Sequence, residues 1–109
     1  LDNIELAGWT DDMSEHYLRT RLIIMPSVWS EPFGRVAVEA GRFQIPTIAT
    51  ATGGLPEAIG NGGILLPVES RKSAWAGAIE SLDDEVPIFI KNMRIFFLYN
   101  KSVRLFHFL

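Results

Sequence analysis

Two glutamates with seven residues between them, Glu31 and Glu39, have the types and spacing that could do chemistry. A carboxylate only accepts hydrogen bonds, so each one suits the vicinal hydroxyls of a sugar or a ribose. Gly34, which lies between them, has no side chain to keep a ligand from the first amides of a following helix. Those amides are unpaired and lie at the positive end of the helix dipole, which favours an anion such as a diphosphate. The segment therefore suits a nucleoside-diphosphate sugar.

The same spacing also arises by chance, because short motifs match many unrelated sequences. In that alternative Pro32 only begins a helix, and Glu39 faces water. The spacing of the two glutamates leaves both interpretations open.

Strands that precede loops are expected to position this segment. The apolar run 22–25, which Pro26 stops, is typical of a strand buried on both faces of a parallel sheet. Further strands are expected at residues 4–8, 46–50 and 63–66.

Helices are expected between these strands. Asp12 and Glu15 form a capping-box pattern, which predicts the start of a helix that ends near Thr20. The apolar face of this helix is expected to comprise Met13, Tyr17 and Leu18. Pro32 fits the first position of a second helix that runs to about Phe43. One helical turn is expected at residues 56–59, and a last helix at 73–82 with Trp75, Ala78, Ile79 and Leu82 facing inward.

Alternating strands and helices with short connections predict an α/β fold, a Rossmann-like parallel sheet with flanking helices. In such sheets ligands bind beyond the carboxyl ends of the strands. The loops at residues 26–34 and 50–55 both follow strands, so both are expected at that end. The pair Gly53-Gly54 in the second loop either lets the backbone approach a ligand or only makes a turn.

Composition limits the classes of function. A chain of 109 residues with 48% hydrophobic residues is sufficient for one globular unit. The absence of cysteine excludes disulfides, thiolate nucleophiles and cysteine-based zinc sites. A net charge of −3 does not indicate nucleic-acid binding. The first residues lack a basic flank followed by an apolar run, so they do not resemble a secretory signal.

Residues 26–40 closely resemble the signature of glycosyltransferase family four (group 1), in which a Glu-Pro-Phe-Gly segment opens the E-x7-E motif. The resemblance covers roughly residues 4–82. The matching flanks, in the order and spacing of the family, are Gly8-Trp9, Pro26-Ser27, Glu39-Ala40, Pro46 and residues 52–57.

This resemblance implies a GT-B architecture with the chain in the C-terminal donor domain, and a retaining reaction without a metal or another cofactor. By position, Glu31 would be the catalytic-site residue that contacts the donor sugar, as a positioning group. The amides of Phe33 and Gly34 would hold sugar or diphosphate, and Glu39 would hold the ribose. Arg35 is a candidate diphosphate contact, with solvent exposure as its alternative.

Two departures from the family pattern affect this expectation. The upstream glycine-arginine and lysine-glycine segment that clamps the diphosphate in the family has no counterpart here, and the first lysine is Lys72. Gln44 stands where the family usually has glycine before Ile45-Pro46. A positive φ at that position would cost about 1 kcal/mol.

The pattern changes after Glu85, the last acidic residue of the chain. Residues 86–109 carry four basic residues and show no clean period of 3.6 or 2. We therefore predict a partial nucleotide-sugar-binding domain at 1–85 and an atypical basic aromatic tail at 86–109, a poor membrane span. Two alternatives for this tail are that it packs on the sheet or that it binds a membrane surface.

The expected function is the donor half of a glycosyltransferase that acts on a saccharide or lipid-linked acceptor. We interpret the chain as a fragment, inactive alone, in the cytoplasm or at the membrane periphery, and completed by a separate N-terminal acceptor domain. The alternatives are a truncated or frameshifted product without activity, and a binding module that docks to such a domain or to a membrane.

Overall fold

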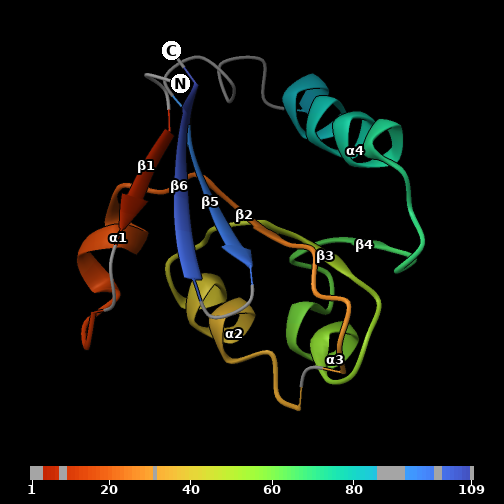
Figure 1. Ribbon diagram of the computed structural model, residues 1–109, viewed down its shortest axis with the longest axis horizontal. Coiled ribbons are helices and arrows are strands. Elements are labelled where there is room, and N and C mark those ends of the chain that lie inside the picture. Colours follow the sequence, from red (N-terminus) through yellow and green to blue (C-terminus); the bar gives the residue numbers. More distant parts are fainter. Residues whose placement is uncertain (1–3, 8–9, 31, 86–92, 100–101, 109) are drawn as a thin grey trace.

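The computed structural model describes residues 4–7, 10–30, 32–85, 93–99 and 102–108 of the chain (Figure 1). In chain order the elements are β1 (Ile4–Ala7), α1 (Ser14–Leu18), β2 (Leu22–Met25), α2 (Arg35–Arg42), β3 (Thr47–Thr50), α3 (Leu55–Ile59), β4 (Gly63–Leu66), α4 (Lys72–Glu85), β5 (Met93–Tyr99) and β6 (Ser102–Phe108).

The strands form one sheet in the order β1-β6-β5-β2-β3-β4. Strands β2, β3 and β4 are parallel, with Ile24 opposite Ile48 and Ile48 opposite Ile64, and β5 is parallel to β2. Strand β6 is antiparallel to both of its neighbours, β1 and β5. The parallel strands with flanking helices confirm the predicted Rossmann-like α/β fold.

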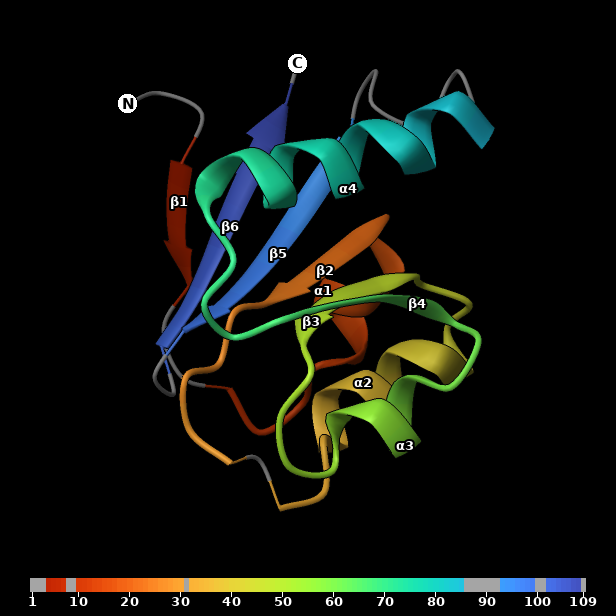
Figure 2. The ribbon, with the colours of Figure 1, turned by 90° about the vertical axis from the view of Figure 1, so that its right-hand side faces the viewer.

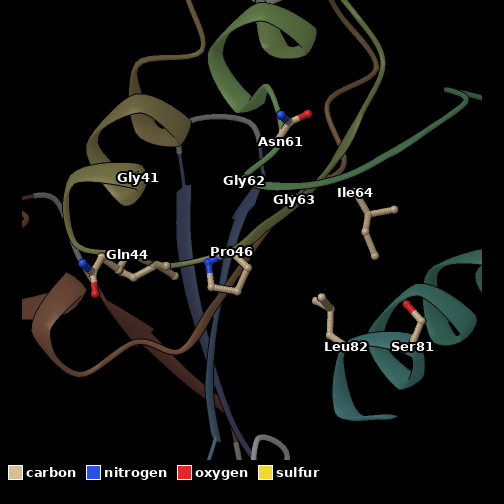
Figure 3. Close-up of a pocket in the computed structure, with 10 residues that line it drawn as sticks. Gly41, Gln44, Pro46, Asn61, Gly62, Gly63, Ile64, Ser81 and Leu82 are labelled. Atoms are coloured by element: carbon tan, nitrogen blue, oxygen red, sulfur yellow. The ribbon is translucent and has the colours of Figure 1, made fainter. Parts of the chain in front are cut away.

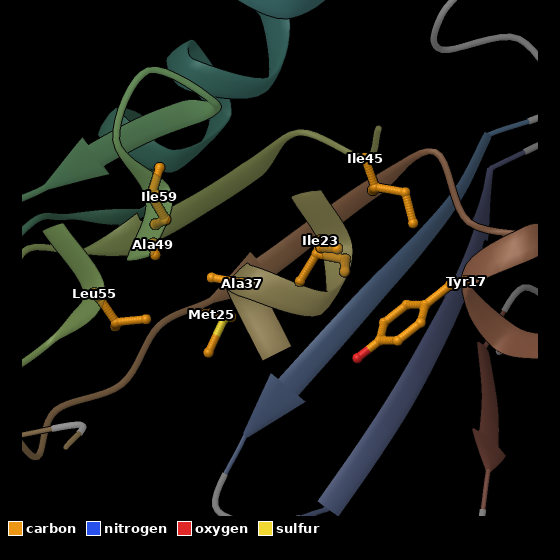
Figure 4. Packing of buried hydrophobic residues seen from close by; sticks show 9 residues of the cluster. Tyr17, Ile23, Met25, Ala37, Ile45, Ala49, Leu55 and Ile59 are labelled. Atoms are coloured by element: carbon orange, nitrogen blue, oxygen red, sulfur yellow. The ribbon is translucent and has the colours of Figure 1, made fainter. Parts of the chain in front are cut away.

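Helices cover both faces of the sheet, with α4 on one face and α2 and α3 on the other (Figure 2). Because successive side chains of a strand point to opposite faces, β2 supplies both cores. Ile23 and Met25 pack in the cluster that includes α1, α2 and α3 (Figure 4), whereas Leu22 and Ile24 pack in the cluster under α4. All four residues of β2 are buried, as its apolar sequence predicts.

The helix α4 has the inward residues that the sequence predicts. Ala78 is buried in the core cluster under α4, and Trp75, Ile79 and Leu82 are partly buried against it. The turn α3 also forms where it is expected, from Leu55 to Ile59.

The predicted start of α2 at Pro32 is wrong, because the helix begins at Arg35. Gly34 precedes it with φ 61° and ψ 41°, in the left-handed region. A left-handed residue cannot continue a right-handed helix, so Pro32 lies in the loop before the helix.

The first helix is shorter than predicted and begins at Ser14, preceded by Met13 without a side-chain cap. Asp12 still contributes, since its Oδ1 accepts a hydrogen bond from the Ser14 amide at 2.9 Å. The helix ends at Leu18, where a tighter turn from Arg19 N–H to the His16 carbonyl follows. Leu18 is 76% exposed, so its predicted place on the apolar face is wrong.

Two strands form in the segment where the sequence shows no clean period. Strand β5 pairs with β2 from Leu22 opposite Ile95 to Ile24 opposite Phe97. Strand β6 then pairs with β5 and with β1, so both strands lie between β1 and β2.

Candidate functional site

The loops that follow β2 and β3 meet at the carboxyl ends of these parallel strands, as the sequence predicts. The Thr50 hydroxyl donates to the Ser27 carbonyl at 2.5 Å, and the Thr52 hydroxyl donates to the Trp29 carbonyl at 3.2 Å. These bonds fix the loop of residues 26–34 to its neighbour at the edge where ligands of such sheets bind.

The glycines of the second loop serve this contact between loops. Gly53 has φ 54°, which makes the turn. A Cβ on Gly54 would lie 2.6 Å from the Pro32 carbonyl oxygen and 3.2 Å from the Phe33 Cα. Gly54 therefore allows the backbone of one loop to approach that of the other.

Gly34 is buried between α2 and α3. A Cβ at this position would lie 2.9 Å from the Ala58 Cβ and 3.1 Å from the Leu55 Cδ2. The missing side chain thus brings α2 close to α3, a packing role that the sequence pattern around Gly34 does not indicate. The neighbouring Phe33 is 83% exposed, whereas Glu31 lies outside the described residues.

Glu39 lies on α2 with its side chain 25% exposed and both carboxylate oxygens bonded. The Tyr17 hydroxyl donates to Oε2 at 2.8 Å, and the Arg35 Nε donates to Oε1 at 2.7 Å. Glu39 is therefore held at a contact between α1 and α2, contrary to the alternative in which it simply faces water.

The carboxyl group of Glu39 and the phenol of Tyr17 keep complementary protonation states. Burial raises the pKa of Glu39, but hydrogen bonds from Tyr17 and Arg35 and the charges of Arg35 and Arg42 outweigh it and hold that pKa below its usual value. Burial, and then the hydrogen bond to Glu39, raise the pKa of the Tyr17 phenol. At neutral pH an ionised carboxylate thus accepts from a protonated phenol.

A cavity of about 270 Å³ opens beside this contact. It is lined by Asp11, Asp12, Met13, Ser14, Tyr17, Arg35, Glu39, Arg42 and Phe43. Ligand sites commonly measure about 300–1,000 Å³, so this cavity suits one part of a ligand.

Arg35 is exposed, with 88% of its side chain accessible, which agrees with the predicted alternative of solvent exposure. Its guanidinium is nevertheless paired with Glu39, four residues along the same helix.

The sequence predicts Tyr17 only as a residue of an apolar helix face, and not as a partner of Glu39. A tyrosine on the apolar face of a helix does indicate such a contact, because a buried tyrosine hydroxyl usually has a hydrogen-bond partner.

A larger cavity of about 480 Å³ lies at the other end of the parallel strands (Figure 3). It is lined by Gly41, Gln44, Ile45, Pro46, Asn61, Gly62, Gly63, Ile64, Ser81 and Leu82. Because these residues include those just before and at the starts of β3 and β4, the cavity is at the amino ends, opposite the edge where such sheets bind ligands.

Neither a metal site nor a membrane span is evident within the described part of the chain. No group of three or more histidine, aspartate or glutamate side chains is arranged to hold a metal ion there. Likewise, none of the described helices combines the length and apolar character needed to cross a bilayer.

Several curated relatives resemble this chain over part of their length. A protein named D-inositol 3-phosphate glycosyltransferase from Arthrobacter sp. (strain FB24) is 42% identical over 82 residues, which cover 74% of this chain and 18% of the relative. A protein of the same name from Rhodococcus erythropolis is 42% identical over 71 residues, covering 64% of this chain and 16% of that protein. An uncharacterised 41.2 kDa protein in the cps region of Klebsiella pneumoniae is 38% identical over 63 residues, 56% of this chain and 17% of its own.

The chain thus spans less than a fifth of the length of these relatives. No solved structure matches it. The family model described as Glycosyl transferases group 1 matches residues 1–85, which are most of the chain. On this match, the chain belongs to the group 1 glycosyl transferases.

Proposed function

We propose that the chain is the donor-binding part of a retaining glycosyltransferase, which transfers a sugar from a nucleoside diphosphate to a saccharide or lipid-linked acceptor. Glu39 binds the ribose hydroxyls, the amides of Phe33 and Gly34 bind sugar or diphosphate, and Glu31 positions the donor sugar. The donor is a substrate, and neither a metal nor another cofactor takes part.

The observation that carries this proposal is the position of Glu39. Its carboxylate is ionised, fixed on α2 and at the wall of a cavity lined by α1, the residues before α1, and α2 with Phe43. Such a group accepts hydrogen bonds from hydroxyls without first losing a proton. Family membership gives the reaction class, and the name of the relatives gives a phosphorylated polyol as one acceptor to test.

The acceptor side of the reaction requires a second domain. We propose that a separate N-terminal domain provides the acceptor site and the cationic clamp on the diphosphate, and that the isolated chain is inactive. The whole enzyme works in the cytoplasm, with peripheral contact to the membrane when its acceptor is lipid-linked.

A chimera tests the function. Residues 1–82 replace the matching segment in the Arthrobacter relative, and the activity in that relative's name is assayed with and without Glu39→Gln. We expect the chimera to transfer sugar and the variant to lose kcat/KM by about 100-fold, as expected when a partly buried, charged hydrogen-bond acceptor is lost. Arg71→Gln, an exposed change outside the cavity, is the control.

The outcomes separate the proposal from its alternatives. An inactive chimera that folds would favour a truncated product whose residues have lost the donor site. An active chimera in which Glu39→Gln behaves like Arg71→Gln would show that Glu39 does not bind the donor.

A further inference from the structure

Tyr17 and Glu39, which are 22 positions apart in the sequence, form a contact between the helices α1 and α2. The Tyr17 ring is 3% exposed and belongs to the core cluster under α2 (Figure 4). It also packs on Phe43, with ring centroids 5.2 Å apart and an angle of 41° between the rings. Because the ring is held on several sides, the hydroxyl has a fixed position opposite Oε2 of Glu39.

The bond from Arg35 to the other carboxylate oxygen is of a different kind. Arg35 and Glu39 are four residues apart on α2, and the arginine side chain is 88% exposed. Exposed pairs at this spacing contribute little, because water screens the charges and long side chains lose entropy when fixed. Arg35 can therefore leave Oε1 at small cost, whereas Tyr17 cannot leave Oε2 without disturbing the core.

We propose that Tyr17 is a positioning residue that holds Oε2 of Glu39 and thereby presents Oε1 to the cavity, where a ligand hydroxyl replaces Arg35. This inference rests on the proposed donor site and adds two roles to it. Tyr17 orients the ribose-binding carboxylate, and Arg35 is its exchangeable partner in the empty site.

The lining of the cavity fits a hydroxyl-bearing group better than a phosphate. Asp11, Asp12 and Glu39 contribute carboxylates, and Arg35 and Arg42 contribute cations. A phosphate would face three carboxylates, while hydroxyls can donate to them and accept from an arginine. The nucleoside part of the donor is therefore the group that this cavity takes.

The first experiment tests the positioning of Glu39 in the full chain without any ligand. NMR follows the titration of the Glu39 side-chain carboxyl carbon, identified by its loss in Glu39→Gln, in the wild type and in Tyr17→Phe. Phenylalanine keeps the ring, and the amide spectrum reports whether the fold is intact. We expect the carboxyl pKa to rise in Tyr17→Phe. An unchanged pKa in a folded variant would overturn the positioning role.

The second experiment measures binding of UDP, GDP and ADP at millimolar concentrations by amide shift changes. We expect Tyr17→Phe to weaken binding by about tenfold, the usual effect of losing one hydrogen bond to a charged group. Arg35→Gln should bind as well as the wild type or better. Arg71→Gln, an exposed arginine outside the cavity with the same charge change, is the matched control.

Each result of the second experiment has one meaning. Equal binding by Tyr17→Phe and the wild type overturns the role of Tyr17. Lost binding in Arg35→Gln, but not in Arg71→Gln, overturns the exchange and makes Arg35 a ligand contact. If none of the nucleotides binds the wild type, the proposal that the free chain binds a donor is wrong, and so is the proposed exchange of Arg35. The carboxyl titration still decides whether Tyr17 positions Glu39.

Discussion

Gly54 lies directly against the backbone of Pro32, so close that a Cβ on Gly54 would be 2.6 Å from the Pro32 carbonyl oxygen. Only a shift of the backbone could make room for such a Cβ, because the atoms in its way belong to the Pro32 backbone and not to a flexible side chain. The contact couples the loop after β3 to the loop of residues 26–34.

We therefore expect Gly54→Ala to destabilise the protein by about 1–3 kcal/mol, the usual cost of inserting a methyl group into a packed region. Denaturant unfolding of the full chain measures this. Gly77→Ala is the matched control, since nothing lies within 4 Å of a Cβ there. Within the helix α4 it should stabilise by about 0.5–1 kcal/mol. Equal effects of the two changes would contradict the contact.

Gln44 has φ 58°, in the left-handed region that the comparison with the family's glycine predicts. We expect Gln44→Gly to raise the free energy of unfolding by about 0.5–1 kcal/mol, because glycine adopts this φ without strain. Gln44→Ala serves as the control, as it shortens the side chain but keeps the Cβ. If Gln44→Ala gained as much stability as Gln44→Gly, the glutamine side chain and not the backbone strain would be the cause.

Stability at high pH should depend on Tyr17. Its pKa is raised in the folded state, so its contribution is complete below the ordinary tyrosine pKa of about 10 and is lost as the pH rises through the folded value. Thermal melting of the wild type and Tyr17→Phe between neutral and alkaline pH measures the difference. The wild type should lose more stability than the variant, and parallel losses would refute the expectation.

Glu39 should act at the opposite end of the pH range. Its folded pKa is lowered, so its contribution is complete above the unfolded value of about 4.3 and is lost as the pH falls through the folded value. Urea unfolding of the wild type and Glu39→Gln across acidic pH tests this. The gap in stability between the two proteins should narrow as the pH falls, and a gap that stays constant would exclude the carboxylate as its source.

Residues 86–109 are predicted to be separable from residues 1–85, and the family match ends at residue 85. We expect a chain without residues 86–109 to keep a cooperative thermal transition. The structure makes this a demanding test, because β5 pairs with β2 at the centre of the sheet. Loss of cooperative melting, compared with the full chain by calorimetry, would make the tail part of the core.

The sequence predicts the elements whose pattern is local. The apolar run of β2 and the inward face of α4 are evident from neighbouring residues, whereas the positive φ at Gln44 follows from the family's glycine at that position. The start of α2 is not, because a left-handed Gly34 depends on its close packing against Ala58 of another helix. In the same way, the bond between Tyr17 and Glu39 requires two helices to be placed side by side.

The placement of β6 between β1 and β5 has a consequence for the order of assembly. Strand β1 pairs with a strand that follows it by about a hundred positions, from Ile4 opposite Phe106 to Ala7 opposite Val103. Contacts so distant in sequence form slowly, because closing a long loop costs entropy before any contact compensates for it. On a ribosome, the unit of β2, β3 and β4 can therefore assemble early, while the first strand waits for residues 102–108 to emerge.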